Sequence, residues 1–329
     1  MSQLIPVGIA GLGHYVPEWV VENDYFTRFI DTSDEWIQQR TGIQQRRWLR
    51  DDQRPSDMFV EAGRMAMERA GVQPEEIDLI MIGTVSADYT CPTNACLVQE
   101  KLGCHNAAAF DMAAACAGFV YTMATGSQFI ATGTYKNVLV MGGEALSRIS
   151  DIYDRNSCVL FGDGAGAAVL QPHEVCKQGL LEGFKLAADG KGYHYIIREY
   201  GGGLKPVTPQ VLVEGSHMLR MKGREVYRFA VAKMIEIMEW GLGDNDLDDV
   251  CLVIPHQMNL RIMETAREKL NIPKDKMEVN IHRYGNTSAA SCAIGLSEAW
   301  AADKLESDKL ILLAAFGSGL VWAGARIRW

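Results

Sequence analysis

Short apolar runs bounded by turn residues alternate along the chain with segments whose apolar residues recur at helical spacing. Residues 78–84, 107–115 and 138–141 are runs of the first kind, and each predicts a buried strand. The first run is followed by a helix from Pro92, because proline suits the first position of a helix. A second helix is predicted from Cys116, with an apolar face made of residues 119, 120, 123 and 130. This alternation predicts α/β layers around a largely parallel sheet.

The second half of the chain repeats the pattern of the first half. A single constant offset in residue number superimposes three pairs of features: residues 78–84 and 250–256, Cys116 and Ser288, and residues 138–141 and 310–313. Any α/β chain gives some matches by chance, but a constant offset over three elements favours duplication. We therefore predict two similar halves, residues 1–172 and 173–329, packed so that Cys116 meets the segments around His256 and Asn286.

Composition and charge narrow the class of protein. The chain has 329 residues, of which 48% are hydrophobic and 22% charged, so disorder, collagen and small disulfide scaffolds are excluded. The longest apolar stretch, residues 310–325, is interrupted by glycines and falls short of the ~20 residues that a bilayer requires, so it predicts core strands. The net charge of −9 argues against nucleic acid and anionic membranes as partners.

The cysteines and the first residues predict a cytoplasmic protein. The eight cysteines contain no CxxC pair, so neither a zinc site nor a disulfide framework is expected. The sequence begins MSQLIPVGIAGLG, without a basic region or a cleavage pattern that would direct export.

Cys116 is the first candidate for chemistry. It lies in the segment Asp-Met-Ala-Ala-Ala-Cys-Ala-Gly-Phe, where a strand of small residues turns into a helix. A thiol over the unpaired N–H groups of a helix start is expected to have a lowered pKa and to act as a nucleophile. The alternative is an ordinary buried cysteine, which is the commoner fate of this residue. Small neighbours such as Gly118 leave room for a substrate and favour the functional interpretation.

Two residues of the second half could complete a site with Cys116. His256 ends a predicted strand, at the position where α/β folds collect ligands and catalytic groups. Asn286, in Gly-Asn-Thr-Ser-Ala-Ala, is by itself better explained as a turn residue or a helix cap than as a functional residue. Together the three supply a nucleophile, a proton donor or acceptor, and an amide donor. The glycine loop at 162–166 does not open a helix, so we interpret it as a structural turn instead of a phosphate site.

Five motifs in order give the chain a family resemblance over nearly its whole length. They are Asp31-Thr-Ser-Asp-Glu-Trp-Ile37 with Arg40-Thr-Gly-Ile43, Ala113-Ala-Ala-Cys-Ala-Gly118, Phe161-Gly-Asp-Gly-Ala-Gly-Ala-Ala168, Pro255-His-Gln-Met-Asn-Leu-Arg261 and Gly285-Asn-Thr-Ser-Ala-Ala290. With them the sequence resembles β-ketoacyl-acyl-carrier-protein synthase III, the condensing enzyme that starts bacterial fatty-acid synthesis. The resemblance implies a thiolase-like fold, with two duplicated halves in five αβαβα layers, and a homodimer.

The resemblance also implies a mechanism. Cys116 would accept an acyl group from acyl-CoA, with the thioester oxyanion held by the backbone N–H groups of Cys116 and Ser318. His256 and Asn286 would then stabilise the enolate formed when malonyl-acyl carrier protein loses carbon dioxide. No metal or redox cofactor is implied.

The resemblance also implies binding residues, at the positions of this sequence that match the binding positions of the family. For CoA they are Thr32, Trp36, Arg40, Arg155, Gly223, Arg224, Asn259 and Arg261. For the acidic carrier protein they are Arg224, Arg228, Arg261 and Lys269, with Glu268 as a departure from the basic pattern. Cys91 matches a position at the end of the acyl pocket, often phenylalanine in the family, that reaches in from the partner subunit.

Two other functions remain open at this stage. One is a specialised relative that transfers acyl groups in secondary metabolism, and the other is a cysteine thioesterase that hydrolyses the acyl-enzyme. The sequence does not specify the chain length or branching of the primer.

Overall fold

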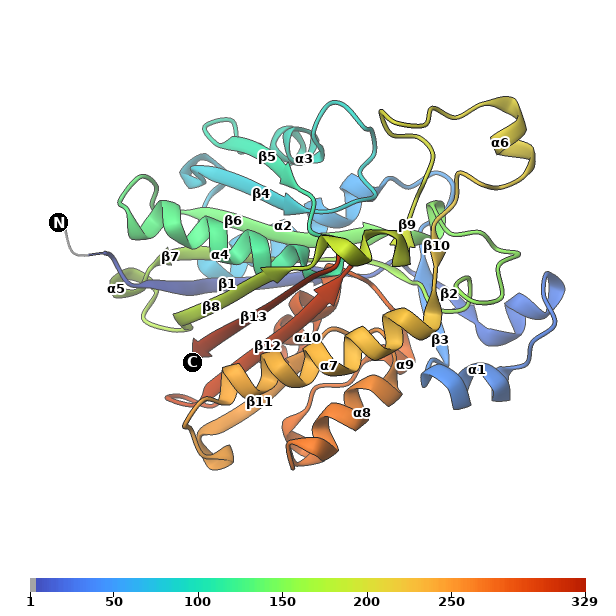
Figure 1. Ribbon diagram of the computed structural model, residues 1–329. Helices are drawn as coiled ribbons and strands as arrows, with labels where there is room; N and C mark the ends of the chain where they lie inside the picture. The colour runs from blue at the N-terminus through green and yellow to red at the C-terminus, as the bar shows by residue number, and fades with distance from the viewer. Residues whose placement is uncertain (1–3) are drawn as a thin grey trace.

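Two β-sheets organise residues 4–329, the part of the chain that the computed structural model describes (Figure 1). The strands of the first sheet are β1 (Val7–Tyr15), β4 (Leu79–Gly83), β5 (Ala108–Met112), β6 (Val138–Ala145) and β7 (Asp163–Pro172). Their order is β1-β7-β6-β4-β5, and β4 pairs in parallel with β5 and β6, whereas β7 runs antiparallel to β6 and β1. Every residue of β4 is buried, as its continuous apolar run requires of a strand covered on both faces.

The second sheet repeats this arrangement with one strand fewer. Its strands are β8 (Leu180–Ala188), β11 (Val250–Pro255), β12 (Leu310–Gly317) and β13 (Val321–Arg328). The order is β11-β12-β13-β8, with β11 and β12 parallel and the other two pairs antiparallel. Both ends of β12 are related to the ends of β6 by the offset that superimposes Ser288 on Cys116, so the repeat seen in the sequence corresponds to equivalent strands.

Helices form three layers around the two sheets. They are α2 (Pro55–Ala70) and α3 (Asn94–Leu102) outside the first sheet, α4 (Gly118–Ala131) and α10 (Ala290–Ala301) between the sheets, and α7 (Gly223–Leu242) with α8 (Leu260–Lys269) outside the second (Figure 1). The same offset relates the start of α10 to the start of α4. The five-layer α/β architecture is therefore confirmed.

Smaller elements complete the described chain. These are the paired strands β2 (Trp19–Glu22) and β3 (Gln45–Trp48), the paired strands β9 (Ile196–Ile197) and β10 (Arg220–Met221), and the helices α1 (Asp34–Thr41), α5 (His173–Cys176), α6 (Pro209–Val213) and α9 (Ile281–Tyr284). Helix α1 packs against α8 and β3 packs against α9, so the beginning of the chain also contacts the second half.

Most of the predicted elements are confirmed, and some boundaries are corrected. The strands at 78–84 and 138–141 are β4 and β6, and residues 310–325 form β12 and most of β13. The helix expected from Pro92 begins at Asn94. Residues 107–115 do not form a buried strand: β5 is shorter and lies at the edge of the sheet, where Phe110 is 36% exposed.

The sequence predicts a structural turn at residues 162–166, and this prediction is wrong. Asp163 begins β7, which pairs with β6 on one side and β1 on the other. Glycine is required at 166 by close packing, because a Cβ there would collide with Ala293 of α10. The small residues therefore let the central helix approach the sheet.

The division of the chain after residue 172 stays a prediction. Among residues 4–329, none of the helices has the length and apolar character needed to cross a bilayer.

Candidate active site

Cys116 lies at the junction of β5 and α4, where the two halves meet. It belongs to a short 3-10 turn, Ala115–Ala117, directly before the start of α4 at Gly118. Ala115 has a φ of 44°, in the left-handed region that costs a non-glycine residue free energy and is frequent at functional sites. The end of β12 packs against this turn, since a Cβ on Gly317 would lie 2.7 Å from the Cys116 backbone nitrogen.

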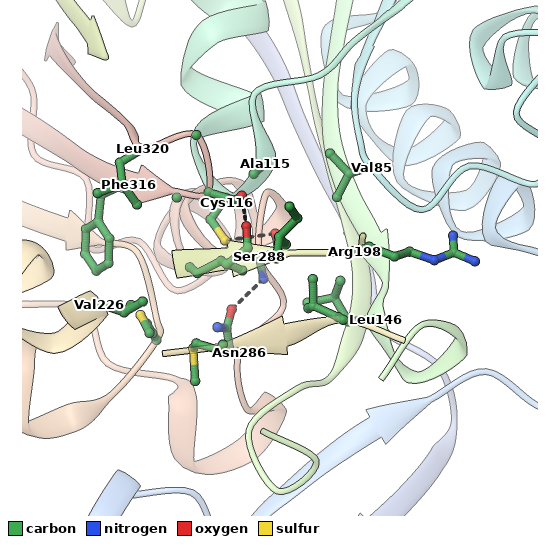
Figure 2. Close-up of a pocket in the computed structure, with 18 of the residues that line it drawn as sticks. Val85, Ala115, Cys116, Leu146, Arg198, Val226, Asn286, Ser288, Phe316 and Leu320 are labelled. Carbon is green, nitrogen blue, oxygen red and sulfur yellow. Dashed lines mark hydrogen bonds between the residues drawn. The ribbon is translucent and has the colours of Figure 1, made fainter. Parts of the chain in front are cut away.

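A cavity of about 340 Å³ opens beside Cys116 (Figure 2). Most of its wall is apolar and includes Val85, Leu146, Val226, Phe316 and Leu320. The same cavity is lined by Cys116, His256, Asn286 and Ser318. The fold thus brings together the three predicted catalytic residues and the predicted oxyanion residue, which come from both halves of the chain.

Asn286 is held in one orientation by its neighbours. Its backbone N–H donates to the carbonyl of Leu160 at 2.8 Å, and its side-chain Oδ1 accepts from the backbone N–H of Ser288 at 2.8 Å (Figure 2). Because Oδ1 is occupied in this way, the amide Nδ2 is the group that Asn286 can offer as a donor in the cavity.

His256 follows β11 and is completely buried. Its backbone N–H donates to the Ala314 carbonyl of β12 at 2.7 Å, and its ring packs edge-on against Phe316 with centroids 5.2 Å apart. Burial lowers the pKa of His256 to about 3, so the imidazole is neutral at physiological pH. Nδ1 lies 2.8 Å from Ser291 Oγ, and Nε2 has no hydrogen-bond partner within residues 4–329.

Ser288 contacts the nucleophile, a feature that sequence reasoning did not identify as functional. Its hydroxyl donates to Cys116 Sγ at 3.1 Å, although the two residues belong to different halves of the chain (Figure 2). The repeat in the sequence makes Ser288 the equivalent of Cys116, and this equivalence is the sequence signal that could have identified it. Ser291 gave no comparable signal.

The expected low pKa of the Cys116 thiol is wrong. Burial raises the pKa of Cys116 to about 12, and the negative charge of buried Glu144 adds to this effect, whereas the hydrogen bond from Ser288 opposes it. The start of α4 is present as the sequence predicted, but desolvation of the thiolate outweighs its favourable dipole. The resting protein therefore holds a protonated thiol.

Alkylation of Cys116 by iodoacetamide should therefore accelerate steadily with pH. With a pKa of about 12, the thiolate fraction rises tenfold for each pH unit from pH 6 to 9, without reaching a plateau. Peptide mapping by mass spectrometry would separate Cys116 from the exposed Cys96. A plateau of the Cys116 rate near pH 7 would show that the thiol has the lowered pKa after all.

A second cavity adjoins the first and contains most of the predicted CoA residues. Five of them line it, namely Trp36, Arg40, Arg155, Gly223 and Asn259. Met221 and Met258 line both cavities, so the second one lies on a route towards Cys116. Thr32, Arg224 and Arg261 do not line it.

Two of these residues already have intramolecular partners. The guanidinium of Arg155 lies 4.1 Å from the centre of the Trp36 ring, on a face that the resemblance assigns to adenine. Asn259 caps α8 by accepting from the Arg261 backbone N–H at 2.9 Å, and its amide donates to the Arg40 carbonyl at 3.0 Å. Asn259 is thus a structural link between α1 and α8.

The predicted carrier-protein residues lie on two neighbouring helices. Arg224 and Arg228 are one turn apart on α7, as the spacing predicted, and Arg228 and Lys269 line a surface groove between α7 and α8. Arg261 is exposed in the first turn of α8. All four side chains are exposed, which is the condition for a docking role.

Cys91 does not line the cavity of its own chain. It is exposed on the loop before α3, so its role at the end of the acyl pocket stays a prediction that requires a partner subunit.

Ser318 donates its hydroxyl to the Ile196 carbonyl at 2.6 Å, which fixes the loop after β12 next to Cys116.

Comparison with known proteins identifies the family. The family model of 3-oxoacyl-[acyl-carrier-protein] synthase III matches residues 110–190, and the model of its C-terminal part matches residues 244–329. The β-ketoacyl-[acyl-carrier-protein] synthase III of Caldanaerobacter subterraneus is 46% identical over 334 residues, covering 100% of this chain and 99% of the relative. This chain belongs to the β-ketoacyl-acyl-carrier-protein synthase III family.

Other synthases III are similar to this chain over nearly its whole length, in sequence or in structure. The one from Bacillus pumilus is 47% identical over 327 residues, with 98% of each chain covered. The crystal structure from Aquifex aeolicus has a TM-score of 0.88 at 40% identity and covers 98% of this chain and 100% of its own. The Thermus thermophilus structure has a TM-score of 0.89 at 38% identity, with coverages of 98% and 99%.

Membership of the synthase III family defines the class of activity and the fold. The chain is an acyl-transferring condensing enzyme of fatty-acid synthesis, and its five layers are those of the thiolase fold.

Proposed function

We propose that the chain condenses an acyl-CoA primer with malonyl-acyl carrier protein, using Cys116, His256 and Asn286. The observation that supports this most strongly is the single cavity in which the thiol, a neutral imidazole and an oriented amide meet. The family names of the relatives specify a carrier-protein-linked β-ketoacyl product.

The first half-reaction moves the acyl group to Cys116. Its sulfur forms a bond to the thioester carbonyl carbon, the bond from that carbon to the CoA sulfur breaks, and the proton of the Cys116 thiol goes to the departing CoA, which leaves as a thiol. The backbone N–H groups of Cys116 and Ser318 are proposed to hold the oxyanion, because the loop after β12 packs against the Cys116 backbone. One such donor is commonly worth ~10²–10³ in rate.

The second half-reaction forms the new carbon–carbon bond. Malonyl-acyl carrier protein loses carbon dioxide, and the enolate oxygen accepts hydrogen bonds from Asn286 Nδ2 and His256 Nε2. The enolate carbon then attacks the acyl carbon on Cys116, and the carbon–sulfur bond to Cys116 breaks to release a thiolate, which takes up a proton from solvent. The β-ketoacyl group leaves on the carrier protein.

Arg40 and Arg155 are proposed to bind the phosphates of CoA at the second cavity. Replacing either with alanine should raise the KM for acyl-CoA about tenfold while kcat changes less, since a charge-assisted hydrogen bond is worth roughly 1.5–3 kcal/mol. Steady-state kinetics with varied acyl-CoA would measure this. Arg64, exposed on α2 and paired with Glu61, provides the control variant Arg64→Ala. An unchanged KM in both Arg40→Ala and Arg155→Ala would contradict the assignment.

The carrier protein is proposed to dock on the exposed cations of α7 and α8 at Arg224, Arg228, Arg261 and Lys269. Carrier proteins are acidic, and these cations stand on an otherwise acidic chain of net charge −9. Arg224 and Arg261 lie within two residues of Gly223 and Asn259, which line the second cavity, so docking here would place the malonyl arm near the route to Cys116.

We also propose a cytoplasmic homodimer. The edge strand β5 leaves backbone groups and Phe110 exposed, which a second copy of the chain would cover. The eight cysteines are free thiols, as expected of a protein in a reducing compartment.

The primer is proposed to be longer or bulkier than acetyl. If Cys91 of a partner closes the acyl pocket, its small side chain leaves space, and each extra methylene accommodated is worth ~1–3 kcal/mol. Cys91→Phe should therefore shift preference towards acetyl by about tenfold or more. Competition between acetyl-CoA and longer acyl-CoAs on both proteins measures the shift, and a wild-type protein that accepts only acetyl-CoA would contradict the premise.

One experiment separates this function from its two rivals. The enzyme is given a panel of acyl-CoAs with and without malonyl-acyl carrier protein, while carbon dioxide, free acid and β-ketoacyl product are followed. The proposal requires carbon dioxide and β-ketoacyl product only when malonyl carrier is present. Free acid without carbon dioxide would indicate a thioesterase, and transfer to another acceptor would indicate a specialised acyltransferase.

A further inference from the structure

Ser288 contacts the nucleophile, and the mechanism described so far gives it no role. Its Oγ lies 3.1 Å from Cys116 Sγ, and its side chain lines the active-site cavity (Figure 2). The residue is 2% exposed, so bulk water has little access to this contact. Within residues 4–329, the hydroxyl of Ser288 has one hydrogen-bond partner, and that partner is the sulfur of Cys116.

The start of α10 holds Ser288 in place. The carbonyl oxygen of Ser288 accepts from the hydroxyl of Ser291 at 2.8 Å and from the Ser291 backbone N–H at 3.1 Å. Its φ of 51° lies in the left-handed region, which costs a serine free energy and is frequent at functional sites. The two bonds to Ser291 do not involve the side chain of Asn286. The hydroxyl is therefore oriented towards the sulfur before any substrate binds.

The charge on the sulfur determines how much the hydroxyl contributes. A thiolate carries no hydrogen and can only accept, so in the anionic state the donor has to be the hydroxyl of Ser288. A hydrogen bond to an ionised group is roughly twice as strong as one between neutral groups. The contact at 3.1 Å therefore stabilises an anionic Cys116 more than a neutral one.

The charged and titratable groups around the sulfur do not supply this stabilisation. The negative charge of Glu144 on β6 raises the pKa of Cys116, and burial keeps the imidazole of His256 neutral by lowering its pKa to about 3. Burial also raises the pKa of Cys292 on α10 to about 12, so its thiol is neutral. Arg198 is the one cation that lines the cavity within the described chain, and it is exposed and points away from Cys116 (Figure 2).

We infer that Ser288 is a further catalytic residue, whose hydroxyl stabilises negative charge on Cys116 Sγ in both half-reactions. The inference deepens the proposed function and rests on it for the steps concerned. In the first half-reaction the sulfur gains negative charge as the thiol loses its proton to the departing CoA. In the second, the carbon–sulfur bond breaks and Cys116 leaves as a thiolate. The hydroxyl keeps its own hydrogen throughout, because it donates a hydrogen bond and transfers no proton.

The expected effect on the attack by Cys116 is smaller than the effect on its ionisation. A hydrogen bond to an ionised group is commonly worth roughly 10- to 100-fold in an equilibrium constant. A stabilised thiolate is also a weaker nucleophile, with a Brønsted coefficient of about 0.4–0.5, so about half of the logarithmic effect reaches the rate. Loss of the hydroxyl should therefore slow the attack about 3- to 10-fold.

Alkylation by iodoacetamide tests the effect on the sulfur without any acyl substrate. Ser288→Ala and Ser288→Gly both remove the hydroxyl, and glycine adopts the left-handed φ without strain, so Ser288→Gly keeps the test valid if alanine disturbs folding. Both variants should alkylate Cys116 about 3- to 10-fold more slowly than the wild type at every pH from 6 to 9, with the same tenfold rise per pH unit.

Ser297→Ala is the matched control for these variants. It removes another buried serine hydroxyl of α10, which contacts His14 Nδ1 at 2.9 Å and does not line the cavity. Its Cys116 should alkylate at the wild-type rate. Ser288→Ala and Ser288→Gly reacting as fast as this control would overturn the inference, and this result would stand whether or not the enzyme makes a β-ketoacyl product.

Single-turnover acylation gives the second readout. At saturating acyl-CoA, both Ser288 variants should acylate Cys116 about 3- to 10-fold more slowly than Ser297→Ala, as followed by intact-protein mass spectrometry. The acyl-CoA concentration for half-maximal rate should stay unchanged, because the hydroxyl contacts the sulfur and not CoA. Slowed alkylation together with acylation at the control rate would also overturn the inference, since the hydroxyl would then favour the thiolate without acting in the reaction.

Discussion

Cys116→Ala should abolish condensation, with a fall in rate of at least ~10³-fold. Among residues 4–329, Cys116 is the only cysteine that lines the active-site cavity, so no second thiol is placed there to hold the acyl group. Cys292 is buried in α10, where its sulfur contacts the Ile254 carbonyl at 3.6 Å, and it does not line the cavity. Alanine is smaller than cysteine and leaves the backbone of the Ala115–Ala117 turn intact.

Intact-protein mass spectrometry after incubation with acyl-CoA measures this prediction directly. The wild type should gain one acyl group, and Cys116→Ala should gain none. Cys96→Ser, which changes an exposed cysteine on α3, should acylate like the wild type. An adduct that persists on another cysteine in Cys116→Ala would remove the nucleophile from the account.

Asn286→Ala is expected to separate the two half-reactions. The amide Nδ2 is proposed to stabilise the enolate and takes no part in the first attack, so Cys116 should still be acylated. Decarboxylation of malonyl-acyl carrier protein should fall ~10²–10³-fold, as expected for the loss of one donor to a developing oxyanion. Acylation is followed by mass spectrometry and decarboxylation by release of labelled carbon dioxide.

Asn286→Asp is the matched variant for this experiment. Its carboxylate can still accept from the Ser288 N–H at the present Oδ1 position, but it no longer offers an amide donor. It should therefore lose decarboxylation as Asn286→Ala does. Loss of acylation with decarboxylation intact, in either variant, would reverse the roles given to this residue.

The repeat in the sequence predicted more of this protein than any single motif. The constant offset between the halves located β6 and β12, the starts of α4 and α10, and the meeting of Cys116 with its equivalent Ser288. The offset located these elements because hydrophobic spacing determines which elements form, and duplicated elements pack in the same way in both halves. The convergence of Cys116, His256 and Asn286 followed from the same symmetry.

Properties that depend on the three-dimensional surroundings could not be predicted in this way. The dipole at the start of α4 can be read from the sequence, but the burial that raises the pKa of Cys116 depends on segments of the other half, such as the end of β12. Similarly, the glycines at 162–166 resemble a turn until the contact between Gly166 and Ala293 is known. Ser291 acquires its place only when α10 packs beside β11.

The measurement that tests the central claim most directly is a single-turnover chase of the isolated acyl-enzyme. Enzyme acylated on Cys116 is freed of acyl-CoA and mixed with malonyl-acyl carrier protein, and the fate of the acyl group is followed by mass spectrometry. We predict that each acyl group leaves Cys116 as one β-ketoacyl-carrier protein, with one carbon dioxide released. Acyl groups that leave as free acid without carbon dioxide, or that stay on Cys116, would contradict the account.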